Sequence, residues 1–318
     1  MKLHELVSFR NTLRDALDLT TILKGIESNQ ERLTSSIPHV NSHYGQKLTN
    51  LSADHYKVFV YAKQDEDKIN SLLEEINHDI EKLTKKFFED NYQTECMSGD
   101  PGFLRQHKVM HMTDESRSIL LGRIHLYSTW KYPALEIGCR DGEWTKELIT
   151  FDPLYIADNH TEFLNNAISQ FTPEYQRRIR QYHIHDFKIY PLDQFGHPHK
   201  YTLPMNQFGL IFSYNYFNYL SLDSIKQFLI QSLELLKPGG TVLFTYNNAD
   251  MSTSAGLTEG YFMTYVPKSM LVPMAESLGF DVIQCFDFQP STSWIELRKP
   301  GTLTTVKAHQ ALGEIKFK

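Results

Sequence analysis

The residues that most constrain the fold are Leu135 to Gly142, with the sequence LEIGCRDG. The apolar run from Pro133 to Ile137 predicts a short strand that carries a carboxylate, Glu136. Glycines follow at 138 and 142, and residues 143–149 are expected to begin a helix. A strand, a glycine turn and a helix allow backbone N–H groups to approach a polar ligand closely. The stretch therefore predicts an α/β fold with a ligand-binding turn.

A second acid follows at the expected distance. The apolar run Tyr155–Asp158 ends in a carboxylate 22 positions after Glu136. An acid at the end of the second strand, about 20 residues downstream, suits hydrogen bonds to ribose hydroxyls. Neighbouring Asn159 is a weaker candidate for the same role. Two strands that end in this way predict a cofactor that contains a nucleoside.

The glycine spacing discriminates between cofactors. A dinucleotide fingerprint needs glycines at 138, 140 and 143, but the chain has Arg140 and Glu143. The E/D-x-G-x-G-x-G pattern of class I S-adenosylmethionine (SAM)-dependent methyltransferases departs only at position 140. Over roughly residues 113–300 the chain resembles this family. The resemblance implies S-adenosyl-L-methionine as cofactor and a seven-stranded Rossmann-like sheet with helices on both faces. It assigns cofactor contacts to Glu136, Gly138, Cys139, Arg140 and Gly142.

Arg140 is the one departure from the pattern, and two outcomes are open. Glycine is usual there because a side chain or an unfavourable φ would interfere with close approach. An arginine is accommodated if its side chain points away, toward the carboxylate of SAM or the substrate. Otherwise cofactor binding is weakened or lost. We favour accommodation because the rest of the pattern is intact.

Other strands carry further matches. Residues 182–187 predict a third strand, where the resemblance places Asp186 at the adenine amino group and Phe187 beside the ring. A fourth strand, Phe208–Ser213, ends with Ser213 at the cofactor. The run LKPGG at 236–240 leads into a fifth strand, and residues 281–288 and 293–298 predict a final strand pair. Such a pair fits the family and disfavours a NAD-dependent oxidoreductase.

Catalytic residues are less well indicated. In this family the rate depends mainly on alignment of acceptor and methyl group, and a general base is needed only for a protonated acceptor. The candidates are His185, Tyr214, Asn215 and Tyr216, although the aromatic residues also suit packing around the adenine. A zinc site of His183, His185, His197 and His199 is disfavoured because no cysteine joins it. We expect no metal.

The first 108 residues differ in character from the rest. Leu3, Leu6, Leu13 and Leu17 predict a first amphipathic helix, which Gly25, the polar run near Ser35-Ser36 and Pro38 are expected to break. The heptad seam from Ile69 to Phe87 predicts a second helix, which either self-associates into a homo-oligomer or packs against the first helix. We favour packing within one chain. The turn-rich run 98–102 suggests a linker, which divides the chain into a helical segment for oligomerisation or docking (1–108), a methyltransferase domain (109–300) and a tail (301–318).

Composition narrows the function. A net charge of −6 argues against a general nucleic-acid binder. The sequence shows neither a signal peptide nor 18 consecutive apolar residues. We therefore expect no membrane span, and we expect a cytoplasmic location. We expect a methyltransferase with a small-molecule or sugar-like acceptor, because the NPPY-type motif of nucleic-acid amino methyltransferases is absent. The alternative is a structural or assembly protein that keeps the fold with weak or no catalysis.

Overall fold

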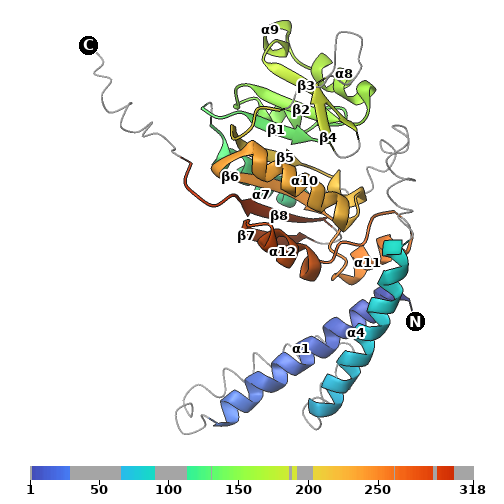
Figure 1. Ribbon diagram of the computed structural model, residues 1–318. Coiled ribbons are helices and arrows are strands. Elements are labelled where there is room, and N and C mark those ends of the chain that lie inside the picture. Colours follow the sequence, from blue (N-terminus) through green and yellow to red (C-terminus); the bar gives the residue numbers. More distant parts are fainter. Residues whose placement is uncertain are drawn as a thin grey trace. The chain divides into compact units, whose positions relative to one another are not determined.

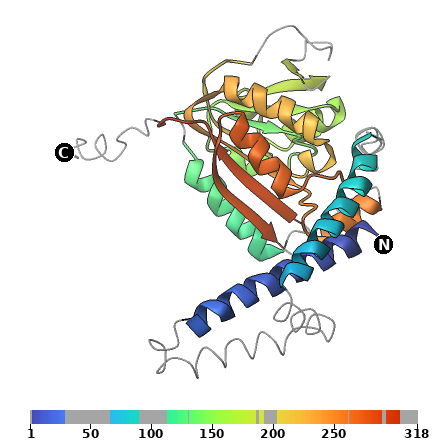
Figure 2. The ribbon, with the colours of Figure 1, turned by 60° about the horizontal axis from the view of Figure 1, so that its bottom comes forward.

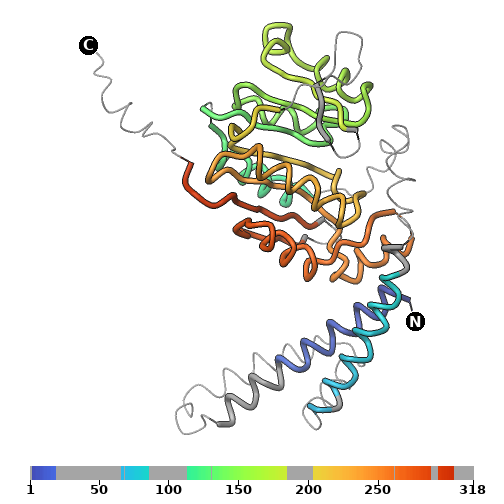
Figure 3. The backbone as a smooth tube through the Cα atoms, viewed as in Figure 1, coloured from blue at the N-terminus to red at the C-terminus, as the bar shows by residue number. Residues whose placement is uncertain are grey.

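The computed structural model describes residues 2–28, 66–89, 113–129, 131–185, 188–191, 203–260, 262–288 and 292–303, and Figure 3 follows the backbone as a tube. The chain divides into two compact units. One consists of Met1–Asp90 with Asp250–Glu259, and the other of Asn91–Ala249 with Gly260–Lys318. Each unit is described by itself.

The larger unit is built on a mixed sheet in the order β4-β3-β2-β1-β5-β6-β8-β7 (Figure 1). Strands β1, β2, β3, β5 and β6 are parallel, whereas β8 runs antiparallel to both β6 and β7. The strands are β1 (Ala134–Ile137), β2 (Leu154–Asp158), β3 (Ile179–His185), β4 (Lys188–Pro191), β5 (Phe208–Ser213), β6 (Leu236–Tyr246), β7 (Asp281–Phe288) and β8 (Thr292–Arg298).

Seven of these strands confirm the expected Rossmann-like sheet, including its final antiparallel pair. Strand β4 is an addition that the sequence did not predict, and it pairs antiparallel with β3 at the edge of the sheet. Parallel neighbours align their carboxyl ends, so β1, β2 and β5 bring three loops to one edge. That edge carries the glycine loop after β1, Asp158 at the end of β2 and Ser213 at the end of β5.

Helices cover both faces of the sheet, as Figure 2 shows for α7 on one side and α10 and α12 on the other. Leu120 and Ile124 of α7 pack with one buried cluster, and Phe228 of α10 and Leu271 of α12 belong to a second cluster. These fully buried strands and helix faces form the core of the unit. The elements are α7 (Asp114–Tyr127), η1 (Thr145–Leu148), α8 (Thr161–Ser169), α9 (Pro173–Gln176), η2 (Phe217–Tyr219), α10 (Leu222–Leu235) and α12 (Lys268–Ser277).

A buried ion pair holds α7 to the sheet. Arg123 donates from Nε and Nη2 to the two carboxylate oxygens of Glu296 on β8, both at 2.6 Å. Tyr127 adds its hydroxyl to the same carboxylate at 2.7 Å. Glu296 is 0% exposed, and these donors compensate for the burial of its charge. Burial also raises the pKa of Tyr127.

Two sequence predictions need correction. Residues 143–149 do not begin an α-helix: only a 3-10 turn forms at Thr145–Leu148. Trp144 and Thr145 are both buried there, which suits a short tight turn better than a continuous amphipathic helix. The first helix, α1, spans Leu3–Ser28 and does not end at Gly25. One glycine inside a long helix costs only about 1 kcal/mol relative to alanine, so the helix continues.

The smaller unit is helical. It comprises α1, α4 (Glu66–Glu89) and α11 (Ser252–Glu259). The seam residues Ile69, Ile76 and Ile80 are buried, and α4 lies against α1. The structure therefore shows packing within the chain, and the alternative of self-association is left to measurement in solution. The proposed linker at 98–102 lies outside the described residues.

The polar and glycine-containing residues 247–266 suggest a loop or lid from the sequence, but they contain α11. Asp250, just before this helix, accepts a hydrogen bond from Arg10 Nη2 at 3.0 Å, and its main-chain oxygen accepts one from Asn11 Nδ2 at 2.9 Å. Glu259, at the other end, accepts backbone hydrogen bonds from Leu3 and His4. These contacts make 250–259 part of the helical unit.

In the described part of the chain, no helix has both the length and the apolar character needed to cross a membrane. The same residues contain no group of three or more His, Cys, Asp or Glu side chains that could hold a metal ion. Of the disfavoured zinc site, His197, His199 and the side chain of His185 lie outside the described residues.

Candidate functional site

The glycine loop follows β1 and is fastened to β2. Gly138 N–H donates to the carbonyl of Ala157 at 2.7 Å, and Gly142 N–H donates to the carbonyl of Cys139 at 2.9 Å, which closes a turn. Gly138 and Gly142 have φ values of 74° and 82°, a region that favours glycine. Both glycines are therefore required by the backbone of the loop itself.

Glu136 lies in the middle of β1 with its side chain buried; the residue is 2% exposed. Its Oε2 accepts a hydrogen bond from Thr145 Oγ1 at 2.6 Å. Burial raises the pKa of Glu136 to about 8, partly opposed by the hydrogen bond from Thr145. The carboxyl group therefore carries a proton at neutral pH and connects the strand to the far side of the glycine loop.

Asp158 ends β2 and is 1% exposed. Its Oδ2 accepts the backbone N–H of Arg140 and its Oδ1 that of His160, each at 3.0 Å. Burial raises the pKa of Asp158, while these hydrogen bonds oppose the increase. Each carboxylate oxygen has two lone pairs, so the side chain can accept two further hydroxyl groups.

Arg140 has a left-handed backbone with a φ of 47°. This explains why the pattern has glycine here, since such a φ is unfavourable for a residue with a Cβ. Its side chain turns toward the loop after β5: Nη2 donates to the carbonyl of Asn215 at 2.7 Å, and the guanidinium lies 5.5 Å from the centre of the Tyr219 ring. The arginine is thus accommodated in the fold. Its effect on cofactor binding remains a prediction.

The loop after β5 contacts the glycine loop closely. A Cβ placed on Gly138 would lie 2.5 Å from side-chain atoms of Tyr216, so this tyrosine requires glycine opposite it. Asn215 N–H donates to Thr245 Oγ1 at 2.6 Å, and the Thr245 hydroxyl donates to Asn218 Oδ1 at 2.9 Å. The loop is therefore fixed to β6 as well as to β1.

The two tyrosines of this loop are poor bases. Burial raises the pKa of Tyr214 to about 12, and it also raises the pKa of Tyr216. Both phenols stay protonated near pH 7. Tyr214 packs against Trp144, with ring centres 4.9 Å apart, which fits a packing role. Asn215 offers an amide and no basic group.

Of the other predicted site residues, some lie near the glycine loop and some lie outside the residues that the structure describes. Ser213 ends β5, is 1% exposed, and its hydroxyl has no partner among the described residues. Cys139 is buried, and burial raises the pKa of its thiol. Asn159 is half-buried beside Asp158. Asp186, Phe187 and the side chain of His185 lie outside the described residues.

Sequence reasoning missed two residues that organise the site. Thr145 holds Glu136, and Thr245 holds the loop at Asn215. A threonine nine positions after an acid gives no local signal, because its importance depends on the turn that the chain takes at the glycine loop. The second threonine lies on a distant strand.

The residues present fit a nucleoside-containing cofactor. Asp158 keeps lone pairs for ribose hydroxyls, the glycines remove side chains from the loop, and the hydroxyl of Ser213 is buried at the end of the adjacent strand without a partner in the described chain. The three features lie on the carboxyl ends of the adjacent strands β1, β2 and β5. Ligands of open parallel sheets bind at this edge.

No family model and no curated protein matches the chain. Among solved structures it is similar to the N-methyltransferase NodS from Bradyrhizobium japonicum in complex with S-adenosyl-L-homocysteine, with 16% identity, a TM-score of 0.47, and coverage of 66% of this chain and 99% of that one. It is also similar to the geranyl diphosphate C-methyltransferase from Streptomyces coelicolor, with 8% identity, a TM-score of 0.47, and coverage of 64% of this chain and 88% of that one. An S-adenosylmethionine-dependent methyltransferase from Mesorhizobium loti has 12% identity and a TM-score of 0.42, and the match covers 56% of this chain and 96% of that one. With TM-scores below 0.5, these likenesses leave the function of the chain to be inferred from its own residues.

Proposed function

We propose that the protein is a SAM-dependent methyltransferase whose acceptor is a small molecule. The observation that carries the proposal is the pairing of a buried strand-end acid, Asp158, with the glycine loop through the backbone N–H of Arg140. A carboxylate at the end of the second strand suits hydrogen bonds to ribose hydroxyls, and this one lies beside a loop that a ligand can approach closely. When bound, SAM supplies an electrophilic methyl group.

The protein's own contribution is binding and orientation. Asp158 accepts the ribose hydroxyls, the loop of Gly138 to Gly142 lies beside the polar part of the cofactor, and Ser213 offers a hydroxyl at the end of the neighbouring strand. Holding acceptor and cofactor in line supplies much of the rate enhancement of such a transfer.

The protonation state of the two tyrosines in the loop after β5 constrains which acceptor atom can be methylated. Because Tyr214 and Tyr216 remain protonated near neutral pH, they do not remove a proton from an acceptor hydroxyl. An acceptor that is nucleophilic without a base, such as a neutral amine, suits this loop. A sugar-like hydroxyl acceptor would need a base from another part of the chain.

Isothermal titration tests the proposal. SAM and S-adenosylhomocysteine should bind with micromolar affinity, on the order of −7 to −8 kcal/mol, and NAD⁺ should not bind. Replacement of Asp158 by alanine should weaken SAM binding by roughly 1–3 kcal/mol. Asp152→Ala is the matched control, because this exposed acid pairs only with Arg178 in the described structure. Equal affinities of the two variants would remove Asp158 from the site.

A second candidate function follows from Arg140. Its side chain occupies a place next to the glycine loop and is bonded to the carbonyl of Asn215, which ties two loops of the site together. If this contact closes the site to SAM, catalysis is weak or absent. The protein then uses the methyltransferase fold in a structural or assembly role. Absence of SAM binding to the intact protein, with binding restored in Arg140→Gly, would favour this function.

A further inference from the structure

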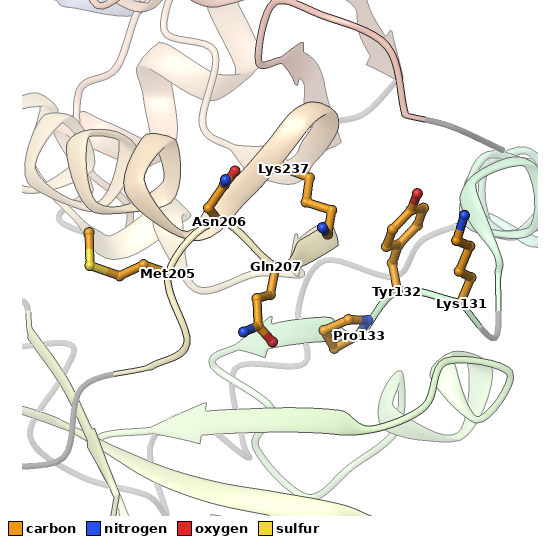
Figure 4. A pocket seen from close by; sticks show the side chains of 7 residues that line it. All are labelled: Lys131, Tyr132, Pro133, Met205, Asn206, Gln207 and Lys237. Carbon is orange, nitrogen blue, oxygen red and sulfur yellow. The ribbon is translucent and has the colours of Figure 1, made fainter.

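The larger unit has a cavity at the edge of the sheet opposite the glycine loop. Its volume is about 450 Å³, and it is lined by Lys131, Tyr132, Pro133, Met205, Asn206, Gln207 and Lys237 (Figure 4). The lining residues precede β1 and β5 or begin β6, whereas the glycine loop follows the carboxyl end of β1. The cavity is therefore separate from the candidate cofactor site.

Two lysines converge on one aromatic ring in this cavity. The Nζ atoms of Lys131 and Lys237 lie 5.3 and 5.4 Å from the centre of the Tyr132 ring. Figure 4 shows Tyr132 between the two lysine side chains. Tyr132 is 5% exposed, and the face of its ring attracts both ammonium groups. The opening of the cavity therefore carries two positive charges.

Lys237 is not needed to compensate the partial negative charge at the carboxyl end of the nearby helix α10. The carboxyl end of α10 is served by Lys299, whose Nζ donates to the carbonyls of Leu233 and Leu236 at 2.6 and 2.8 Å. Among the described residues, Lys237 has no carboxylate partner, and its contact is the Tyr132 ring. Its charge is therefore available to a ligand.

The neighbouring segment supplies neutral polar groups on a fixed backbone. Asn206 and Gln207 donate their backbone N–H groups to the carbonyls of Glu234 and Leu235 at 2.8 and 2.9 Å. Their side-chain amides are exposed at the cavity, and Met205 beside them is 60% exposed. The cavity thus combines two cations, two amides and an apolar side chain.

We propose that this cavity binds a small organic molecule that carries a phosphate group. The ammonium groups of Lys131 and Lys237 bind the phosphate, the amides of Asn206 and Gln207 bind polar groups of the remainder, and Met205 contacts its carbon atoms. A cavity of this volume lies within the range of small-molecule sites. Lysine ammonium groups form strong charge-assisted hydrogen bonds with phosphate oxygens.

A purely structural role for the two lysines would have different consequences. In that case their apolar stems serve only to cover Tyr132, and their charges have no function. Replacement of both by methionine keeps an apolar stem on the ring and removes the charge. Lys226→Met on the exposed face of α10 is the matched control for loss of a positive charge elsewhere.

Titrations with inorganic pyrophosphate and glucose 6-phosphate, with glucose as the uncharged comparison, test the site. Both phosphates should bind the intact protein, glucose should not, and the double variant Lys131→Met/Lys237→Met should lose about tenfold or more in affinity. Lys226→Met should bind as the intact protein does. The proposal is overturned if neither phosphate binds, if the double variant binds equally well, or if Lys226→Met loses as much affinity.

A melting experiment covers the case of a poorly folded double variant. A ligand that binds the folded state raises the melting temperature, and the increase depends on its concentration. Pyrophosphate should raise the melting temperature of the intact protein and of Lys226→Met. It should do so to a much smaller extent in the single variant Lys237→Met, and an equal shift in all three proteins rejects the site. SAM affinity should be unchanged in every variant, which separates this result from the test of the proposed function.

Discussion

The backbone N–H of Arg140 donates a hydrogen bond to Oδ2 of Asp158 at 3.0 Å. This bond joins the one position that departs from the methyltransferase pattern to the acid that the pattern assigns to ribose. It involves only the main chain of Arg140, and the φ of 47° is the conformation that glycine adopts readily. The loop therefore keeps the geometry of the pattern although its residue differs.

Replacement of Arg140 by glycine should leave SAM affinity unchanged within about twofold or improve it slightly. The N–H group that bonds to Asp158 stays, and the strain of a side chain at positive φ, roughly 1 kcal/mol, is relieved. Side-by-side titration of the variant and the intact protein is the measurement. A several-fold loss in the variant would instead assign the guanidinium to the cofactor.

Glu136 should make stability depend on pH. Its folded pKa is about 8, above the unfolded value of 4.5, because of burial. Between these values only the folded state holds the proton, so stability is full below about pH 4.5 and falls as the pH rises toward 8, by up to about 1.4 kcal/mol per pH unit. Glu136→Gln stays neutral and can still accept the hydrogen bond from Thr145. Urea unfolding at pH 5 and pH 8 should show a smaller decrease for the variant; parallel decreases would mean that Glu136 is ionised in the folded protein.

The features that could be predicted from the sequence are those with local signals. Apolar runs that end in an acid, a glycine or a serine located β1, β2 and β5, and LKPGG located the start of β6. Helix α11 was missed because its place depends on Arg10, 240 residues before Asp250, and such a contact has no signature within either segment. Thr145 was missed for the same reason. Strand β4 has four residues and pairs only at the sheet edge, too short a run for periodicity to reveal.

Gly138 should be intolerant of a side chain. Gly138→Ala introduces a Cβ 2.5 Å from Tyr216 at a φ of 74°, which should destabilise the protein by about 2–4 kcal/mol. Gly122→Ala is the matched control: a Cβ there meets nothing within 4 Å and lies in α7, so it should stabilise by about 0.5–1 kcal/mol. Denaturant unfolding measures both. Addition of Tyr216→Gly, which removes the Cβ as well as the ring, should recover part of the loss at 138, and an additive double variant would show that the clash is not the cause.

The heptad helix should not drive association. Ile69, Ile76 and Ile80 are buried in the unit that α4 forms with α1, so the seam has little apolar surface to offer a second copy. Light scattering on the full-length protein should therefore give the mass of one chain, 37.0 kDa. A concentration-dependent dimer that Ile76→Asp abolishes would restore the coiled-coil alternative.

The ion pair between Arg10 and Asp250 should decide whether residues 250–259 stay with the helical unit. The Arg10 side chain is 7% exposed, and Asp250→Asn would leave its charge buried without a carboxylate. Loss of one partner of a buried pair costs about 3 kcal/mol, whereas Asp152→Asn, in the exposed pair with Arg178, should cost no more than about 1 kcal/mol. Hydrogen exchange measures the effect separately for each element. In Asp250→Asn the amides of α1 and α11 should exchange faster, while the exchange rates of the β5 and β6 amides should stay the same. Unchanged exchange in both helices would show that Asn11 and Glu259 suffice to hold the segment, and uniformly faster exchange would show that the two units unfold together.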